Sequence, residues 1–204
     1  MPHHYILLAN PSPKSFCHSV AWAYAEEVKR AGQSFEIRDL NQIPFDPVLK
    51  DESLPARGTP PSPWVEAELD RLAARAAIVM VYPIWFGGPP AILKGYIDRV
   101  FGTGCDIGGF QDGKGPRALK GKWLLTITTS AASRDWLAGR GQQRALREGW
   151  EVYLERGFAM RDAGHLSIDR IVPNISRAYA DEQLERVRQA ARETCGRLDA
   201  DARG

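Results

Sequence analysis

The feature that most constrains the fold of this chain is an alternation of short apolar runs with longer segments of helical periodicity. Apolar runs stand at residues 5–9, 77–82 and 123–128, and the middle run, AIVMVY, presents apolar side chains to both faces of a strand. Strands buried on both faces are typical of parallel sheets that helices cover on each side. Strands alternate with helices five times, so the sequence predicts an α/β fold: an open, doubly wound sheet of five parallel strands with helices on both faces.

The spacing of apolar residues also sets the expected order of the elements. Between the strand at 123–128 and the next helix, residues 129–141 are expected to form a polar loop, and the six prolines of residues 41–63 predict a long surface excursion. Ser15 is placed to cap the first helix and Gly32 to close it. The expected helices contain residues 20–31, 64–76, 91–101, 142–156 and 179–198, and the expected strands are residues 5–9, 34–40, 77–82, 123–128 and 158–168.

Composition narrows the class of protein. The 204 residues, 44% of them hydrophobic, are enough for one substantial core, so we expect a single domain over residues 1–204. The net charge of +2 is not gathered into a basic block, which argues against nucleic acid as the main partner. The longest apolar run, residues 78–86, is far short of the roughly 18–20 residues that cross a bilayer. We therefore expect a cytoplasmic protein without stable membrane insertion.

The cysteines and histidines give no support to a metal site. Cys17, Cys105 and Cys195 lie too far apart for a disulfide framework or a CxxC knuckle to be inferred from them. None of the four histidines is spaced as a ligand with a set of carboxylates. No metal is expected, and a reducing compartment is the simplest location.

The predicted topology indicates where a ligand would lie. In open α/β sheets, ligands bind beyond the carboxyl ends of the strands, where the strand order reverses. Three loops occupy that position, at residues 10–15, 83–90 and 128–141.

The first of these loops opens directly into a helix. Free backbone N–H groups and the helix dipole favour an anion there, with the Ser15 hydroxyl and the Lys14 charge beside them. A second interpretation, that Ser15 is only a helix cap, stays open at this point. The loop has no GxxxxGK[ST] motif, which excludes a P-loop nucleotidase.

The second loop offers flat apolar faces. Trp85 and Phe86 lie among prolines and glycines in the stretch YPIWFGGPPAILKGYIDRV, which suits a planar ligand with hydrogen-bonding groups along one edge. The alternative is that both rings pack into the core. Their place between a buried strand and a helix, at the binding end of the sheet, favours a ligand.

These stretches resemble a known family, the flavodoxin-like NAD(P)H:quinone oxidoreductases. YPIWFGGPPAILKGYIDRVF resembles the family's flavin-ring loop and the helix after it, and LLANPSPKSFCHS resembles its phosphate loop, with Asn10 where a histidine often stands. LTITTSA resembles the third flavin contact, with Ser130 and Ala131 where two glycines are frequent. Together with FDPVLKDES, the similarity in layout covers nearly the whole chain.

The resemblance implies a flavin, FAD or FMN, with NAD(P)H as co-substrate. It places the flavin phosphate among residues of the first loop and the edge of the ring against the second and third loops. The residues that it implies for cofactor binding are Asn10, Ser15, Phe16, Cys17, Pro83, Ile84, Trp85, Phe86, Thr128, Thr129 and Ser130.

The resemblance also implies a two-electron reaction. NAD(P)H gives a hydride to flavin N5 and leaves, and a quinone then takes two electrons in the same cleft, which predicts ping-pong kinetics. Where the family has a tyrosine and a histidine, this chain has Trp136 and Arg140, which are the expected catalytic residues. An arginine stabilises negative charge but does not shuttle protons.

Alternatives remain open within this fold. An azo or nitro reductase shares the same machinery, whereas a one-electron carrier of the flavodoxin type fits poorly with a pI near 8.5. A flavoprotein that regulates a membrane transporter is a third possibility. The resemblance further implies a homodimer, with Trp64, Phe110 and Trp136 as apolar loop residues for an interface. The Pro-rich excursion and residues 104–120 could cover the adenine half of FAD, which slightly favours FAD over FMN.

Overall fold

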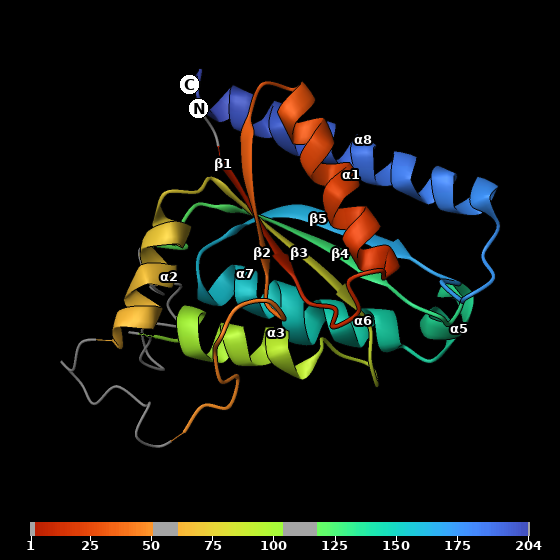
Figure 1. The fold of residues 1–204 in the computed structure, drawn as a ribbon, viewed down its shortest axis with the longest axis horizontal. Helices are drawn as coiled ribbons and strands as arrows, with labels where there is room; N and C mark the ends of the chain where they lie inside the picture. The colour runs from red at the N-terminus through yellow and green to blue at the C-terminus, as the bar shows by residue number, and fades with distance from the viewer. Residues whose placement is uncertain (1–2, 51–60, 104–117, 204) are drawn as a thin grey trace.

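A five-stranded, all-parallel sheet runs through the centre of the computed structural model, with helices on both of its faces (Figure 1). The structure describes residues 3–50, 61–103 and 118–203. The strand order is β2-β1-β3-β4-β5, which confirms the predicted doubly wound α/β fold. The strands are β1 (His3–Leu8), β2 (Ser34–Asp39), β3 (Ala77–Pro83), β4 (Trp123–Thr129) and β5 (Arg161–Ile168).

Two helices cover one face of the sheet and the remaining long segments cover the other. Figure 1 shows α1 and α8 side by side on the first face, with α2, α3, α6 and α7 on the opposite side. The helical segments are α1 (Phe16–Arg30), α2 (Pro63–Ala73), α3 (Ala91–Tyr96), η2 (Ile97–Phe101), α5 (Arg134–Gly139), α6 (Gln142–Leu146), η3 (Arg147–Val152), α7 (Tyr153–Gly157) and α8 (Arg177–Asp201). The segments η2 and η3 are π-helical turns within otherwise continuous helices.

Each face of the sheet has its own apolar core, because successive residues of a strand point to opposite faces. In β1, Ile6 and Leu8 pack with α1 and α8, whereas Tyr5 and Leu7 pack with α2, α3 and α7. Residues 77–82 of β3 are fully buried, as their apolar character on both faces predicts. The sheet is therefore a central layer that can form only when helices cover both sides.

Two local features differ from the sequence prediction. The expected loop at 129–141 contains the short helix α5, which buries only Leu137 and so shows no apolar periodicity. The last strand begins at Arg161 rather than at 158, because Phe158 ends α7 and Ala159 has a left-handed φ of 51°. The Phe158 side chain packs in the apolar core although the residue lies between α7 and β5 and is not part of the strand.

In the part of the chain that the structure describes, no helix is long and apolar enough to cross a membrane. Residues 51–60 and 104–117 lie outside the described residues. The predicted cover for an adenine half of FAD falls largely on these two segments, and so does Phe110.

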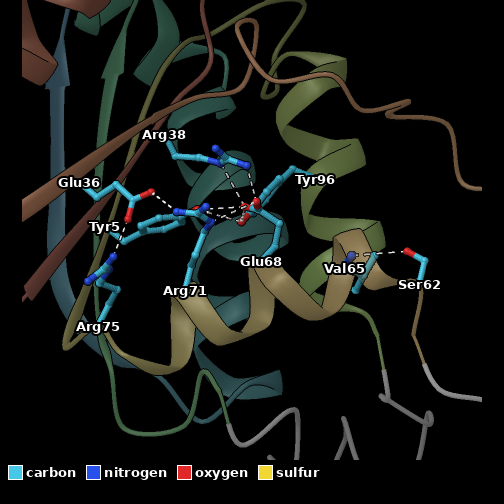
Figure 2. A network of polar contacts seen from close by, with 9 residues as sticks. All are labelled: Tyr5, Glu36, Arg38, Ser62, Val65, Glu68, Arg71, Arg75 and Tyr96. Carbon is cyan, nitrogen blue, oxygen red and sulfur yellow. Dashed lines mark hydrogen bonds and ion pairs between the residues drawn. The ribbon is translucent and has the colours of Figure 1, made fainter.

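A buried carboxylate ties α2 to the sheet and to α3 (Figure 2). The Glu68 side chain is 1% exposed and accepts hydrogen bonds from the hydroxyls of Tyr5 (3.0 Å) and Tyr96 (2.9 Å). The guanidinium of Arg38, on β2, pairs with both oxygens of the same carboxylate. One acidic side chain thus joins β1, β2 and α3, and α3 is the helix that follows the second predicted ligand loop.

We expect Glu68→Gln to destabilise the protein by about 2–4 kcal/mol, because the change leaves the charge of Arg38 unpaired and leaves one carboxamide oxygen, in place of two carboxylate oxygens, for the buried donors around it. The free energy of unfolding in denaturant measures this loss. Glu66→Gln is the matched control, since Glu66 is exposed on the same helix. Equal unfolding midpoints for the two variants would contradict a stabilising role for the buried carboxylate.

Candidate active site

A pocket of about 510 Å³ opens at the carboxyl ends of the strands. It lies where the loops after β1, β3, β4 and β5 meet, at the position that the topology predicts for a ligand. Its lining residues are Asn10, Lys14, Ser15, Phe16, Cys17, Ser19, Pro83, Ile84, Trp85, Thr129, Ser130, Ala131, Ile171, Val172, Pro173 and Ile175. The structure therefore brings together nine of the residues that the sequence assigned to a cofactor.

Strand pairing continues into the rim of the pocket and fixes the loops. Pro83 pairs in register with Thr129, and the Ile84 N–H donates to the Thr129 carbonyl at 2.8 Å. The Ser130 N–H donates to the Ile168 carbonyl, and the Ile171 N–H donates to the Ser130 carbonyl. The carboxyl ends of β3, β4 and β5 are therefore held together by backbone hydrogen bonds.

The first turn of α1 faces this pocket without a side-chain cap. Ser62, Ser133 and Ser176 stand at the N-caps of α2, α5 and α8, and each accepts a hydrogen bond from a first-turn amide. Ser15 holds the equivalent position on α1 but makes no such hydrogen bond. The His18 N–H donates to the Ser15 carbonyl, but the Phe16 and Cys17 N–H groups have no acceptor within the helix or from the Ser15 side chain, which favours an anion at this position.

The Ser15 hydroxyl is instead part of a short polar chain. Its Oγ lies 2.9 Å from Nδ1 of His18, and Nε2 of His18 lies 3.1 Å from the Asp39 carboxylate. A carboxylate only accepts hydrogen bonds, so Nε2 of His18 carries a proton that it donates to Asp39. The Ser15 hydroxyl is thus oriented by a histidine that the carboxyl end of β2 holds in place.

The second loop forms a tight turn at the mouth of the pocket. Trp85 and Gly88 exchange two backbone hydrogen bonds of 3.0 Å, and the two residues between them have positive φ angles, 49° for Phe86 and 86° for Gly87. Trp85 lines the pocket and is 46% exposed. The Phe86 ring is fully exposed at the tip of the turn and does not line the pocket.

The two threonines at the end of β4 point to opposite faces of the sheet, as adjacent strand residues do. The hydroxyl of Thr129 lies 3.2 Å from the Cys17 thiol and faces the pocket. The hydroxyl of Thr128 is 2.8 Å from Nε2 of His165, and Thr128 does not line the pocket. Burial raises the pKa of the Cys17 thiol, so it is present as a protonated, weakly polar group.

Comparison with known proteins agrees with this arrangement. Residues 2–194 match the sequence family described as having the flavodoxin-like fold. The chain is 31% identical to an uncharacterized NAD(P)H oxidoreductase of Haemophilus influenzae over 71% of this chain and 72% of that protein. It is 30% identical to the NAD(P)H oxidoreductase YcaK of Escherichia coli, covering 72% of this chain and 69% of that protein.

A solved structure supports the same assignment. The NAD(P)H:quinone oxidoreductase from Methanothermobacter marburgensis superimposes with a TM-score of 0.78 and 27% identity, over 93% of this chain and 94% of that chain. The chain belongs to the flavodoxin-like NAD(P)H:quinone oxidoreductase family. This confirms the family inferred from the loops, and the protein is an oxidoreductase of that type.

Of the two expected catalytic residues of this oxidoreductase, Trp136 lies on α5 and Arg140 directly follows that helix, and both belong to the third loop. The Arg140 guanidinium stands 4.5 Å from the centre of the Trp136 ring, which is half-exposed. Neither residue lines the pocket in this structure. Their role toward a substrate therefore stays a prediction.

The sequence analysis did not assign the fifth strand's loop to the site. Ile171, Val172, Pro173 and Ile175 supply one apolar wall of the pocket, although only three loops were expected there. The rule that ligands lie beyond the carboxyl ends of strands applies to β5 as well, and residues 169–176 follow it directly. The topological rule, rather than any motif, is the signal that identifies these residues.

Below the third loop, a buried acid–base pair supports Thr128. The His165 ring bonds Thr128 through Nε2, and its Nδ1 lies 3.1 Å from a carboxylate oxygen of Glu151, which is 1% exposed. Burial raises the pKa of Glu151 to about 7 and lowers the pKa of His165 to about 4. Desolvation disfavours the charged form of each group, so both are neutral over a range of mildly acidic pH.

This burial predicts a pH-dependent stability. Because the pKa of Glu151 rises from 4.5 to about 7 on folding, the folded protein holds a proton in that range that the unfolded chain releases. The free energy of unfolding, relative to that of Glu151→Gln, should therefore fall by about 2–3 kcal/mol as pH rises through this window. Denaturant unfolding of the wild type and of Glu151→Gln at several pH values measures this difference in unfolding free energy. Both proteins contain His165, so its titration cancels from the difference.

Glu182→Gln, at an exposed position on α8, serves as the control and should show a flat difference from the wild type. A flat difference for Glu151→Gln as well would show that the buried carboxyl group titrates normally.

Proposed function

We propose that this chain is a flavin-dependent NAD(P)H:quinone oxidoreductase that binds FAD or FMN in the pocket at the carboxyl ends of its strands. The observation that carries the proposal is the division of that pocket into two chemically different ends. One end presents uncapped helix amides and a lysine, and the other presents a tight backbone turn with an indole face. A flavin nucleotide, with its phosphate and its flat ring, matches both ends.

The donors at the first end fit a phosphate group. The amides of the first turn of α1, at Phe16 and Cys17, have no acceptor within the helix, and Lys14 lines the same end. Phosphate bound at a helix N-terminus gains both from these amides and from the helix dipole. Ser15, oriented by His18, completes the set of groups that would hold the phosphate.

The other end fits a planar ring with polar atoms along one edge. Ile84 and Trp85 provide apolar contact, and Thr129, Ser130 and Ala131 provide polar atoms and backbone on the facing side. When bound, the flavin supplies two-electron chemistry, accepting a hydride from NAD(P)H and reducing a quinone. The protein's part is to bind and orient both partners and to stabilise charge.

Arg140 is the residue that we propose for charge stabilisation. It directly follows α5, the helix within the third loop that carries Trp136, and its guanidinium is stacked on the Trp136 ring. A permanent cation placed beside a ring that gains negative charge lowers the energy of that state, but it does not take up or release a proton. We propose that any proton needed by the quinone comes from solvent.

We also propose that the protein acts as a homodimer. Trp85, Phe86, Trp136 and Tyr153 are large side chains that are at least 46% exposed. We propose that these exposed aromatic side chains contribute to the dimer interface, since interaction surfaces expose large apolar groups. Trp64, by contrast, is stacked on Phe45 within the chain at 5.1 Å, which removes it from the predicted interface.

The first test is the presence and identity of the chromophore. The purified protein should be yellow or become yellow when flavin is added, and chromatography of the extracted chromophore distinguishes FAD from FMN. Ser15→Ala should weaken flavin binding by about tenfold or more, because it removes a hydrogen bond to a charged group. Ser12→Ala, in the same loop but not lining the pocket, is the matched control. A protein that stays colourless with added flavin contradicts the proposal.

The second test is kinetic. Initial rates measured against NADH at several menadione concentrations should give parallel double-reciprocal lines, because the two substrates use the cleft in turn. Arg140→Gln should lower kcat/KM for the quinone by about tenfold. The control is Arg177→Gln, at a highly exposed arginine at the start of α8. Intersecting lines would rule out the ping-pong order, and unchanged kinetics in Arg140→Gln would rule out its role.

A further inference from the structure

A second hollow, of about 460 Å³, lies against the edge strand β5 and shares no lining residue with the pocket described above. It is built from the start of α5, from α6 and η3, from β5 and from one arginine of α8. We call this cavity the arginine hollow. Its lining residues are Arg134, Gln143, Arg144, Arg147, Glu148, Gly164, His165, Ser167 and Arg186. Four guanidinium groups therefore surround one cavity, with a single carboxylate among the lining residues.

Most of this positive charge is not neutralised by the protein. Arg147 is paired, since it bonds the carboxylates of Glu151 (3.3 Å) and Asp162 (2.6 Å). Arg186 bonds only neutral oxygens, those of the Gln183 side chain and the Ser167 backbone. Within residues 3–50, 61–103 and 118–203, Arg134 and Arg144 form no ion pair with a carboxylate.

The remaining charged and titratable groups do not cancel this excess. Glu148 is the one acid lining the hollow, and it has no ion pair with the described basic residues. His165 is neutral, because burial first, and then Arg147 and Arg134, lower its pKa to about 4.

Gathering like charges around a cavity costs free energy unless a counter-charge occupies it. Guanidinium groups bind oxyanions through two parallel N–H donors, and several of them together favour a multiply charged phosphate over a single carboxylate. The Gln143 amide and the Ser167 hydroxyl add neutral donors to the same wall. We infer that the arginine hollow is a binding site for a phosphate-bearing anion of charge −2 or greater.

Two sources of such an anion are compatible with this chemistry. One is a phosphate group of the dinucleotide co-substrate, an assignment that rests on the proposed function. The other is a separate phosphorylated small molecule that binds at the edge of β5, away from the flavin pocket. The anion site itself is independent of whether the chain binds flavin.

Titration calorimetry with inorganic pyrophosphate tests the site on the full chain as purified. The double variant Arg134→Gln/Arg144→Gln should bind pyrophosphate at least about tenfold more weakly than the wild type, because two charge-assisted contacts are lost. Glu148→Gln should bind it more tightly, because the variant removes the one lining carboxylate. Arg156→Gln, an exposed arginine of α7 outside the hollow, is the control and should bind as the wild type does.

Pyrophosphate can also occupy the first turn of α1, so the same titration is made with Ser15→Ala, which should leave binding at the hollow unchanged. Thermal unfolding checks that each variant is folded. If the double variant does not fold, the single variant Arg144→Gln is titrated in its place. The inference is overturned if the wild type binds no pyrophosphate, or if the double variant binds it as tightly as the wild type.

The two sources are separated by KM values for NADPH and NADH. If the hollow receives the additional phosphate of the dinucleotide, the double variant should raise KM for NADPH about tenfold and leave KM for NADH unchanged. If KM stays unchanged for both while pyrophosphate binding is lost, the ligand is a separate phosphorylated molecule. A colourless, inactive protein that binds pyrophosphate through these arginines would contradict the proposed function and uphold this site.

Discussion

The burial of both faces of β1, β3 and β4 is the constraint on which the rest of the structure depends. Side chains that point alternately into two apolar cores require helices on both sides of the sheet, and helices that connect parallel strands must return each strand to the same starting edge. All carboxyl ends then lie along one rim, with their loops adjacent. The pocket forms at this rim, where the backbone of these loops lies next to the N-terminus of α1.

Periodicity predicted the fold because the helices and strands that form the cores carry their apolar residues at regular spacing. The elements it missed are those that contribute little to either core. The helix α5 buries Leu137 alone, so its sequence has the composition of a polar loop. Phe158 has the opposite character: it is an apolar residue in the turn before β5, and apolarity alone does not distinguish a buried turn from a strand.

The site was predicted to the level of loops but not of individual side chains. Motif and topology brought Ser15, Trp85 and Thr129 to one pocket, because each lies at or beyond the carboxyl end of a parallel strand. They did not separate Thr128 from Thr129, whose opposite directions depend on strand register. The chain of hydrogen bonds from Ser15 through His18 to β2 joins residues far apart in sequence, and only the folded structure reveals it.

The same backbone segment separates the proposed flavin pocket from the arginine hollow. Ser130 bonds both Ile168 and Ile171, so the loops after β4 and β5 are joined on the pocket side. On the other side, the Asp169 carboxylate accepts from the Arg134 N–H and the Tyr179 hydroxyl, and these hydrogen bonds help to lower its pKa. Arg134 lines the hollow and Ala131 lines the pocket, so an anion that draws Arg134 inward would act on a segment only three residues from the pocket wall. The hydrogen bond from the Arg134 N–H to the Asp169 carboxylate resists that movement. The hydrogen bonds between pocket and hollow therefore favour two sites that bind their ligands independently, without strong coupling.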